Sequence, residues 1–416
     1  MGRLASFLLL LLIAASCAHG QERLHWRDLL AELEARNPSL EAAQKTLEAM
    51  RQRAPQAGSL PDPMVGIRSL SMPSPLPFQG LGSDPMITAG LMVSQQFPAR
   101  GTRKLRYQIA QTEAQAERGT YEQVWNTLVG ELQRAWVEYR YAFDALALLE
   151  ENQRLFGEVL RASEARYAVG EGSQRDLLQA QTQLSLLATK RERLEQGKRV
   201  AEAKVNALLG REPFRSLPPP VTPSPAAPPA EIAALIEGLP DSSPLLERAA
   251  KQIEARGLGV ALARKSYQPE TKVSGTYMNR GGYAPMWELS LEFSIPAWFR
   301  SKQRPEVAER TFELAAARRE YEATLQDLGF QVREQYEMAR TAQRLIGIYD
   351  DTVIPQARLA LESSMEGYET GKADFLNVLN GFVTLVDYRM AQLDERRNLE
   401  LAISRMGELT GKELLP

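Results

Sequence analysis

The side chains best suited to bind a soft metal ion are methionines that gather in two parts of the chain. Met64, Met72, Met86 and Met92 lie in the first part, and Met278 and Met286 lie in the second. They make up half of the 12 methionines. Because a thioether is a soft ligand, Cu(I) or Ag(I) is one candidate ligand class. Methionine is also an ordinary residue of loops and apolar strands, so organic ligands stay open as the other class.

Groups for catalysis are scarce. The two histidines, His19 and His25, lie near the start of the chain, and Cys17 is the one cysteine. A histidine-based active site, a cysteine metal cluster and an intrachain disulfide are therefore not expected. No nucleophile elbow, paired-acid motif or phosphate loop occurs, and the net charge of -2 gives no basic footprint for nucleic acid. We predict that the chain is not an enzyme and needs no cofactor.

The N-terminus is typical of a secretory signal, with Arg3 before the apolar stretch 7–13 and small residues after it. We expect residues 1–20 to be the signal, and two cleavage patterns stay open. Ala18-His19-Gly20 suits an ordinary signal peptidase, whereas Ala14-Ala15-Ser16-Cys17 is similar to a bacterial lipoprotein box. In the second case Cys17 becomes a lipid-modified (palmitoylated) N-terminus. Both patterns predict export, and no later run of about 18 apolar residues predicts a spanning helix.

An internal duplication organises the rest of the chain. Tyr167-x-x-Gly170 is echoed by Tyr368-x-x-Gly371, and Gln96-Phe97-Pro98 by Ser294-Ile295-Pro296. The spacing between the copies is about two hundred residues in each case. We predict repeat 1 over residues 21–216, a Pro-rich linker over 217–230 and repeat 2 over 231–416.

Each repeat predicts a helix, two strands, a very long helix, a turn and a returning helix. Leu128, Leu132 and Ala135 start a heptad pattern in the first long helix, which is typical of helices that supercoil around neighbours. Pro355 should kink or open the second one. In repeat 1 we expect a helix over 26–57 broken at Asn37-Pro38, strands over 64–70 and 86–95, and helices over 102–169 and 173–209. In repeat 2 we expect helices over 243–265, 302–369 and 374–410, with strands over 270–279 and 287–295.

The strands show clean two-residue alternation, most clearly over 287–295, where Glu288 and Glu292 alternate with apolar residues. About ten residues suit a tilted strand that crosses hydrocarbon. Four strands cannot close a barrel, and open edges are not tolerated in lipid, so several chains would have to pool their strands. The alternative is a small water-soluble sheet packed on helices. Six basic residues flank the strands and are expected to mark the membrane–water boundary: Arg100, Arg103, Lys104, Arg300, Lys302 and Arg304.

The chain resembles the TolC family of outer-membrane efflux proteins. The resemblance is carried by the duplication, by Leu60-Pro61-Asp62-Pro63, by Gln95-Gln96-Phe97-Pro98, and most specifically by the motif that begins at Arg166-Tyr167-x-x-Gly170 and ends at Ala180-Gln181. It implies a mainly α fold with a small transmembrane β part. Three chains would form a 12-stranded β-barrel continued by a coiled-coil α-helical barrel. Such a homotrimer lies in the outer membrane, in contact with lipid, and extends into the periplasm.

The resemblance also implies the function. These proteins are passive exit ducts for an inner-membrane pump, here expected to be proton-driven, and are joined to it by a periplasmic adaptor protein. The cargo would be drugs and other organic compounds, or heavy-metal ions such as Cu or Ag. A soluble periplasmic coiled-coil adaptor or scaffold is the alternative function.

The resemblance further implies roles for residues at the two turns and in the strands. The tips that contact the adaptor would be Val169, Gly170, Glu171 and Gly172 in repeat 1, and Gly371, Lys372 and Ala373 in repeat 2. The periplasmic gate would include Asp176, Tyr368, Asp374, Asn377 and Asn380, and the barrel lumen Glu288 and Glu292. Members of the family often carry acidic residues at the positions of Asn377 and Asn380 and a basic residue at Ala373. This departure predicts weak block of the entrance by cations.

Overall fold

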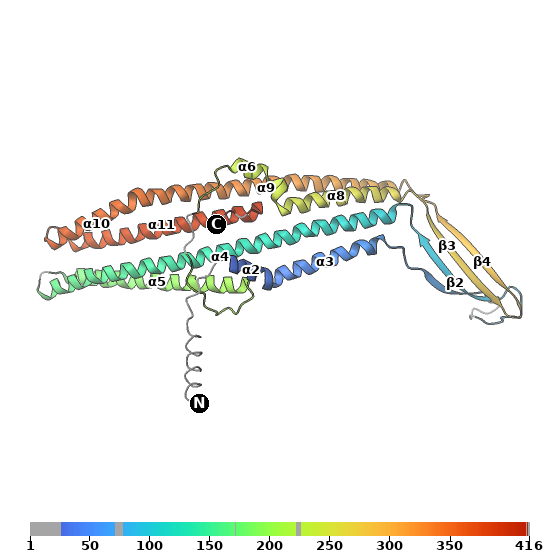
Figure 1. Cartoon of the computed structure of the whole chain (residues 1–416), viewed down its shortest axis with the longest axis horizontal. Helices are drawn as coiled ribbons and strands as arrows, with labels where there is room; N and C mark the ends of the chain where they lie inside the picture. Colours follow the sequence, from blue (N-terminus) through green and yellow to red (C-terminus); the bar gives the residue numbers. More distant parts are fainter. Residues whose placement is uncertain (1–25, 71–77, 171, 222–225, 413, 415–416) are drawn as a thin grey trace, which may run out of the picture. The chain divides into compact units, whose positions relative to one another are not determined.

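The structure is a computed structural model that describes residues 26–70, 78–170, 172–221, 226–412 and 414. The described part is mainly helical, with one four-stranded sheet (Figure 1). Repeat 1 contains α2 (Trp26–Arg36), α3 (Pro38–Gly58), β1 (Met64–Leu70), β2 (Thr88–Phe97), α4 (Thr102–Ala168) and α5 (Gln174–Leu208). Repeat 2 contains α6 (Ile232–Glu237), α7 (Leu239–Ser242), α8 (Pro244–Lys265), β3 (Glu270–Arg280), β4 (Tyr283–Ser294), α9 (Gln303–Ile348), η2 (Tyr349–Val353), α10 (Ile354–Glu369) and α11 (Phe375–Thr410).

The compact units of the chain are not the two repeats that the sequence suggested as domains. Unit 1 takes the chain up to Glu41, residues 123–243 and residues from Asp327 onward, whereas unit 2 takes residues 42–122 and 244–326. Each unit therefore contains part of both repeats. The reason is the length of α4 and α9, because each of these helices contributes residues to both units.

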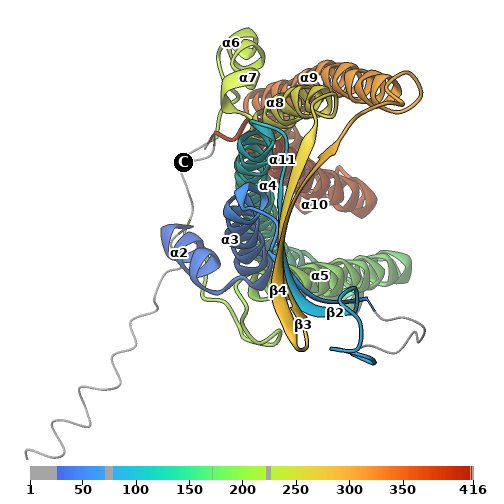
Figure 2. The ribbon, with the colours of Figure 1, turned by 90° about the vertical axis from the view of Figure 1, so that its right-hand side faces the viewer.

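The sheet belongs to unit 2 and has the strand order β1-β2-β3-β4, with every neighbouring pair antiparallel. Figure 2 shows β2, β3 and β4 of this sheet. Gly90 on β2 is needed for this close pairing, since a Cβ there would lie 1.8 Å from the Tyr277 carbonyl oxygen. Within the described chain, β1 and β4 each keep one edge without a strand partner. The register puts Leu91 opposite Tyr277, and Tyr277 opposite Trp287, so these side chains share one face.

That face is apolar and exposed. It carries Val65, Ile67, Leu91, Val93, Trp287, Leu289, Leu291 and Phe293, and the Trp287 side chain is 78% exposed. The opposite face carries mainly polar and charged residues, including Arg68, Lys272, Glu288 and Glu292. Exposed apolar residues in a single contiguous patch of this kind mark a surface that another molecule or a membrane covers.

The sheet curls toward its polar face. Arg68 Nη1 on β1 lies 2.7 Å from Glu288 Oε2 on β4, although β2 and β3 lie between these two strands. In a flat sheet three strand spacings would separate them by roughly 14 Å. The ion pair joins the two outer strands across the polar side of β2 and β3, which favours a concave polar face and a convex apolar face.

Helix packing in unit 1 follows the heptad pattern of α4. Leu132, Tyr139, Leu149 and Phe156 are almost completely buried. One apolar cluster joins α4, α5, α10 and α11, and includes the Phe156 and Phe382 rings, whose centroids are 4.9 Å apart. A second cluster joins α9 to α11 through small residues, among them Ala339, which favour close approach of the helices.

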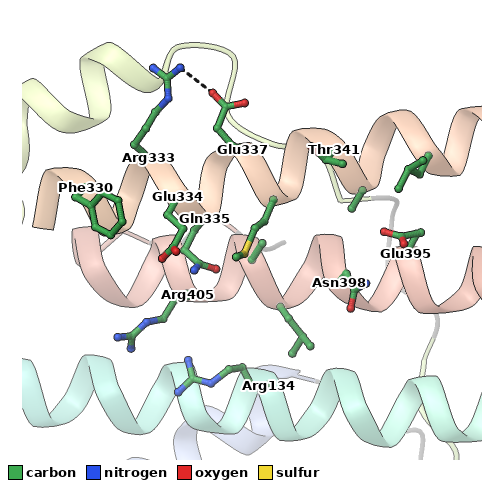
Figure 3. A pocket seen from close by; sticks show the side chains of 15 residues that line it. Arg134, Phe330, Arg333, Glu334, Gln335, Glu337, Thr341, Glu395, Asn398 and Arg405 are labelled. Carbon is green, nitrogen blue, oxygen red and sulfur yellow. Dashed lines mark ion pairs between the residues drawn. The ribbon is translucent and has the colours of Figure 1, made fainter. Parts of the chain in front are cut away.

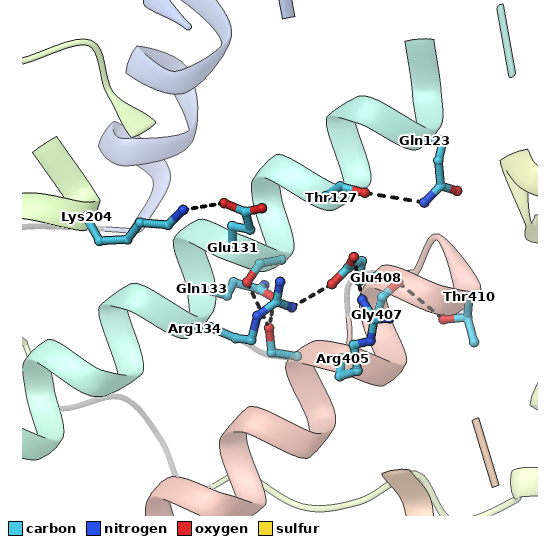
Figure 4. Close-up of polar contacts among 12 residues, drawn as sticks. Gln123, Thr127, Glu131, Gln133, Arg134, Lys204, Arg405, Gly407, Glu408 and Thr410 are labelled. Atoms are coloured by element: carbon cyan, nitrogen blue, oxygen red, sulfur yellow. Dashed lines mark hydrogen bonds and ion pairs between the residues drawn. The ribbon is translucent and has the colours of Figure 1, made fainter. Parts of the chain in front are cut away.

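A polar network also fastens α4 to α11 in unit 1 (Figure 4). Glu408 Oε2 lies 2.6 Å from Arg134 Nη1 on α4, and Glu408 Oε1 lies 2.6 Å from Arg405 Nη1 on its own helix. Gly130 leaves room for this carboxylate, because a Cβ at that position would lie 2.8 Å from Glu408 Oε2. Lys204 Nζ on α5 lies 2.6 Å from Glu131 on α4, so three helices are cross-linked at one level.

The break between α2 and α3 lies at Asn37, as its position before Pro38 indicated. Its side-chain oxygen accepts hydrogen bonds from the backbone N–H groups of Ser39 and Leu40, which caps α3. Its amide nitrogen donates to the Leu208 carbonyl at 2.8 Å, so the same residue fixes the end of α5. Tyr139 on α4 has its hydroxyl oxygen 3.1 Å from the Leu217 carbonyl and thus holds the start of the linker.

The second long helix is opened by a π-helical turn, η2, immediately before Pro355. Asp350 in this turn accepts a hydrogen bond from the Gln392 amide and lies 3.4 Å from Arg396 Nη2, both on α11. A proline lacks the N–H that a regular helix needs, and a π-turn is a common way to absorb such a defect. The structure therefore agrees with the expectation that Pro355 opens this helix.

Candidate functional site

The first tip joins α4 to α5 in unit 1. Gly170 has a φ of +80°, and its N–H donates to the Tyr167 carbonyl at 3.0 Å. The Gly172 N–H donates to the Arg166 carbonyl at 3.1 Å, and a Cβ on Gly172 would lie 2.8 Å from the Tyr167 nitrogen. These contacts form a glycine-dependent helix stop. Val169 is 71% exposed, and Glu171 lies outside the described residues.

The second tip repeats this chemistry between α10 and α11. Gly371 has a φ of +71°, its N–H donates to the Tyr368 carbonyl at 3.1 Å, and the Lys372 N–H donates to the Gly367 carbonyl at 2.7 Å. This pair of bonds is the Schellman arrangement. Open space surrounds both Gly170 and Gly371, so the backbone of each tip is accessible. Lys372 is exposed and Ala373 is half-buried.

Arg166 connects the two tips. Its guanidinium lies 4.6 Å from the centre of the Tyr368 ring, and its Nη1 donates to the Tyr368 carbonyl at 3.0 Å. The Tyr368 ring is in turn 5.7 Å from the Phe375 ring at the start of α11. One arginine of repeat 1 therefore holds the end of repeat 2's hairpin, by a hydrogen bond and a cation–π contact.

The predicted gate residues do not form one cluster within a single chain. Tyr368 is half-buried in the contact with Arg166, whereas Asp374, Asn377 and Asn380 are exposed. Asp176 is buried at 9% exposure, and its Oδ1 has no hydrogen-bond partner among the described residues. Arg166 was missed as a gate candidate, although its place directly before the Tyr-x-x-Gly motif was the signal that could have found it.

The two predicted lumen carboxylates lie on the concave polar face, and both are paired with cations. Glu288 pairs with Arg68, and Glu292 Oε2 lies 3.5 Å from Lys272 Nζ. Both pairs are substantially exposed. Because a cation lies beside each of them, Glu288 and Glu292 do not present two uncompensated negative charges on this face.

Four methionines share this concave face. Met64 lies opposite Ser94, Met92 lies opposite Gly66, and Met278 lies directly opposite Met286. Their thioethers thus occupy three successive levels along the strands. Met86 is exposed just before the start of β2, and Met72 lies outside the described residues. No group of three or more His, Cys, Asp or Glu residues with metal-binding geometry occurs in the part of the chain that the structure describes.

Another candidate surface is a groove of about 890 Å³ in unit 1, between α9 and α11 (Figure 3). Arg134 of α4 and Arg405 of α11 line one side, and the Arg333–Glu337 ion pair of α9 lies at its other side. Phe330 and Met338 of α9 also line it, and each is more than half exposed. The groove combines an apolar strip with charged borders, which suits a protein partner.

None of the described helices combines the length and the low polarity that a membrane-crossing helix requires.

Comparison with known proteins gives consistent results. The family model described as "Outer membrane efflux protein" matches residues 29–211 and 235–412. The chain is 25% identical over 280 residues to the outer membrane efflux protein BepC of Brucella suis, an alignment that covers 64% of this chain and 59% of BepC. The chain thus spans less than two thirds of the length of that curated relative.

Two solved structures share the fold. The CusC structure has a TM-score of 0.80 at 15% identity, and the likeness covers 94% of this chain and 93% of CusC. The outer membrane protein VceC of Vibrio cholerae has a TM-score of 0.77 at 16% identity and covers 94% and 96% of the two chains. At these identities the likeness establishes the fold, while the family model carries the assignment.

Proposed function

The chain belongs to the outer membrane efflux protein family, and from this premise we propose that it is the passive exit duct of a tripartite export system. It is an outer-membrane protein that extends into the periplasm, with the sheet in the membrane. The observation that carries the proposal is the curled amphipathic sheet, which has an exposed apolar convex face and two open edges.

Open strand edges are costly in lipid, because their N–H and C=O groups find no partner there. A barrel removes them. Three copies with four strands each give twelve strands, an even number within the range of outer-membrane barrels. We therefore propose a homotrimer in which β1 of one copy pairs with β4 of the next. The concave polar faces would then line a water-filled lumen, and the convex faces would contact the lipid.

The two glycine tips are the proposed docking points for a periplasmic adaptor protein. The proposal is supported by their exposure, by the matching helix stops and by the backbone left open at Gly170 and Gly371. Val169, Gly172, Lys372 and Ala373 complete the proposed contact, with Glu171 as a further expected member. The adaptor would link the duct to an inner-membrane pump, which we expect to be driven by protons. The family match favours this duct over the alternative of a soluble adaptor.

The gate is proposed at the same end, around Arg166 and Tyr368, with Asp176, Asp374, Asn377 and Asn380 from each copy facing one another across the entrance. Since Asn377 and Asn380 are uncharged, three copies would supply six amides from these positions instead of six carboxylates. We expect divalent cations to block such an entrance weakly.

Two classes of cargo are proposed for the duct: organic compounds and soft metal ions. The methionines on the concave sheet face favour the second class, because Cu(I) and Ag(I) could pass from one thioether level to the next. Replacing Met92, Met278 and Met286 by leucine keeps their volume and removes the sulfur. Copper or silver tolerance should fall while export of an organic dye stays unchanged, and equal effects on both cargoes would contradict a metal role.

Cys17 lies outside the described residues, and its lipidation stays a prediction. The intact mass of the mature protein decides between a lipidated Cys17 and cleavage before Gln21.

The function itself is tested by reconstituting the purified protein into planar bilayers and vesicles. The proposal expects ion-conducting pores and resistance to extraction from membranes by high salt or carbonate. A protein that is released by such washes and forms no pores would instead be the soluble scaffold.

A further inference from the structure

Unit 2 concentrates positive charge where its helices meet the sheet. Arg100, Arg103 and Lys104 surround the start of α4, and Arg300, Lys302 and Arg304 surround the start of α9. All six are exposed, and none forms an ion pair with an acidic residue among the described residues. We call these residues the basic collar.

The fold adds a further positive charge to the collar, and the repulsion between these cations is unfavourable. Lys265, at the end of α8, has its Nζ 3.7 Å from where a Cβ on Gly101 would lie, so its ammonium group is held beside Arg100 and Arg103. Cations at a helix N-terminus also oppose the helix dipole. No acidic residue occurs between Pro98 and Thr112, nor between Ile295 and Pro305. This part of the chain therefore lacks the anions that would balance it.

A groove of about 540 Å³ lies within the collar and has one basic and one apolar part. Arg100, Arg103 and Lys104 contribute the basic part, while Leu60, Phe97 and Tyr107 contribute apolar and aromatic surface. Arg103 uses its Nε to donate to the Gly58 carbonyl at 2.9 Å, which fixes the side chain and leaves its terminal nitrogens available. Such a groove matches a molecule that joins an anionic head to a hydrocarbon tail.

The groove lies beside the apolar face of the sheet, and this position indicates that the bound molecule is a membrane lipid. The apolar convex face ends beside the collar, at Phe97 on β2, at Phe293 on β4 and at Ile295 directly after β4. Trp298 and Phe299 follow at once, and both are exposed, with Arg300 lying 5.8 Å from the centre of the Phe299 ring. Exposed aromatic rings beside basic residues are typical of a membrane–water interface.

We propose that the basic collar binds the phosphate groups of anionic phospholipids, with the groove of Arg100, Arg103 and Lys104 as the principal site. This inference rests on the proposed position of the sheet in the membrane. Because the collar lies at the helix end of the strands, its lipids belong to the leaflet that faces the periplasm. Bound lipid supplies the missing counter-charge and fixes the depth of the strands in the bilayer.

The test is to titrate the detergent-solubilised full-length protein with short-chain phosphatidylglycerol or phosphatidylcholine and to follow the lipid-dependent shift in Tm. Arg100→Gln/Lys104→Gln removes two cations, and each basic residue near an anionic lipid surface adds about fivefold to affinity. We expect phosphatidylglycerol to bind this variant about 10- to 25-fold more weakly than the natural protein. Arg100→Lys/Lys104→Arg keeps the charges and should restore binding, and high salt should weaken it in every case.

The matched control is Arg193→Gln/Arg318→Gln, which removes two exposed arginines that also lack ion pairs and lie away from the collar. It should bind phosphatidylglycerol as the natural protein does. Equal binding of the two lipids, or unchanged binding by the collar variant, would overturn the inference. Full competition by inorganic phosphate at the same concentration would also overturn it, since it would reveal an anion site that does not require lipid.

Pore formation separates this inference from the proposed function. The collar variant should still conduct in phosphatidylcholine bilayers, because its strands are intact. If the protein conducts but shows no preference for anionic lipid, only the proposal that the collar binds lipid is rejected. If it forms no pores in any lipid, the proposed function as an exit duct is rejected.

Discussion

At the scale of single residues, Arg166 is the contact between the two repeats at their tips. It combines a hydrogen bond to the Tyr368 carbonyl with a cation–π contact to the Tyr368 ring. A basic residue is absent at position 373, which the resemblance marked as the usual site of such a group. Arg166 instead places a cation against Tyr368, which lies before the second tip.

Replacing Arg166 by glutamine should loosen the second tip and open the gate. The cation–π contact and the hydrogen bond together stabilise the closed tip by about 1–2 kcal/mol. Their loss should raise the open fraction of the gate, and we therefore expect single-channel conductance in planar bilayers to rise severalfold. Arg161→Gln, which removes an exposed arginine on the same helix, is the control and should conduct as the natural protein does. A closed pore in the Arg166 variant would show that the latch lies elsewhere.

Glu32 gives a residue-scale prediction about acid stability. Its hydrogen bonds from Arg211, followed by the charge of that residue, hold the pKa of Glu32 below the ordinary value of 4.5. A carboxyl whose folded-state pKa is depressed stabilises the fold above its unfolded pKa, and this contribution is lost as the pH falls through the folded pKa. Amide-exchange protection of α2 should therefore fall below pH 4.5 in the natural protein.

The Glu32→Gln variant lacks the titrating group. Its α2 should be less protected at neutral pH and should change little as the pH falls below 4.5. If both proteins lost α2 protection in parallel with pH, the link between Glu32 and Arg211 would be unimportant for stability.

At the scale of elements, the sequence predicted most of the secondary structure, because heptads, prolines and glycines mark where helices run and stop. The start of β4 differs for a physical reason. We expected this strand from Trp287, after Pro285, but it begins at Tyr283. β4 is an edge strand of the sheet, so the missing N–H of Pro285 can face away from β3 without loss of a ladder bond.

Contacts between distant elements could not be predicted from local patterns. Arg68 and Glu288 are 220 residues apart, and they meet because the sheet places β1 and β4 on either side of β2 and β3. The π-turn before Pro355 likewise depends on how Asp350 meets α11, whereas the sequence indicated only a defect in the helix. Local sequence patterns thus predicted the helices and strands, whereas the contacts between distant residues depend on the tertiary structure.

The tips offer an element-scale prediction. Gly371 has a positive φ, so Gly371→Val should destabilise the turn by about 1–2 kcal/mol, whereas Gly371→Asn should be tolerated because asparagine enters this region more readily. Amide exchange of residues 366–373 should rise for valine and stay near the natural rate for asparagine. Gly257→Ala, a change inside α8 with open space around it, should be neutral or stabilising.

At the scale of the whole molecule, two helical stretches leave apolar stripes exposed in unit 1. α5 presents Leu178, Leu186 and Val200, and the α9–α10 stretch presents Phe330, Met338, Ile348 and Leu359. Their spacings return each set to one side of its helix. A ring of identical copies would bury the α5 stripe of one chain against the α9–α10 stripe of the next, as a heterologous closed interface requires.

Phe330→Glu/Leu359→Glu should therefore reduce the trimer fraction in detergent, since both side chains are exposed in one chain and the change should leave helicity intact. Phe214→Glu is the control, because Phe214 is 99% exposed and lies between α5 and the linker, outside both stripes. The two proteins would be compared by light scattering and circular dichroism. Equal trimer fractions would exclude these stripes from the interface.

The central claim is that one chain supplies only four strands of a channel, and the particle mass in detergent tests it most directly. Native mass spectrometry of the mature protein, after release from the detergent micelle, should give three copies, and the same preparation should form pores in a planar bilayer. A stable single copy, or a trimer that never conducts in any lipid, would contradict the account.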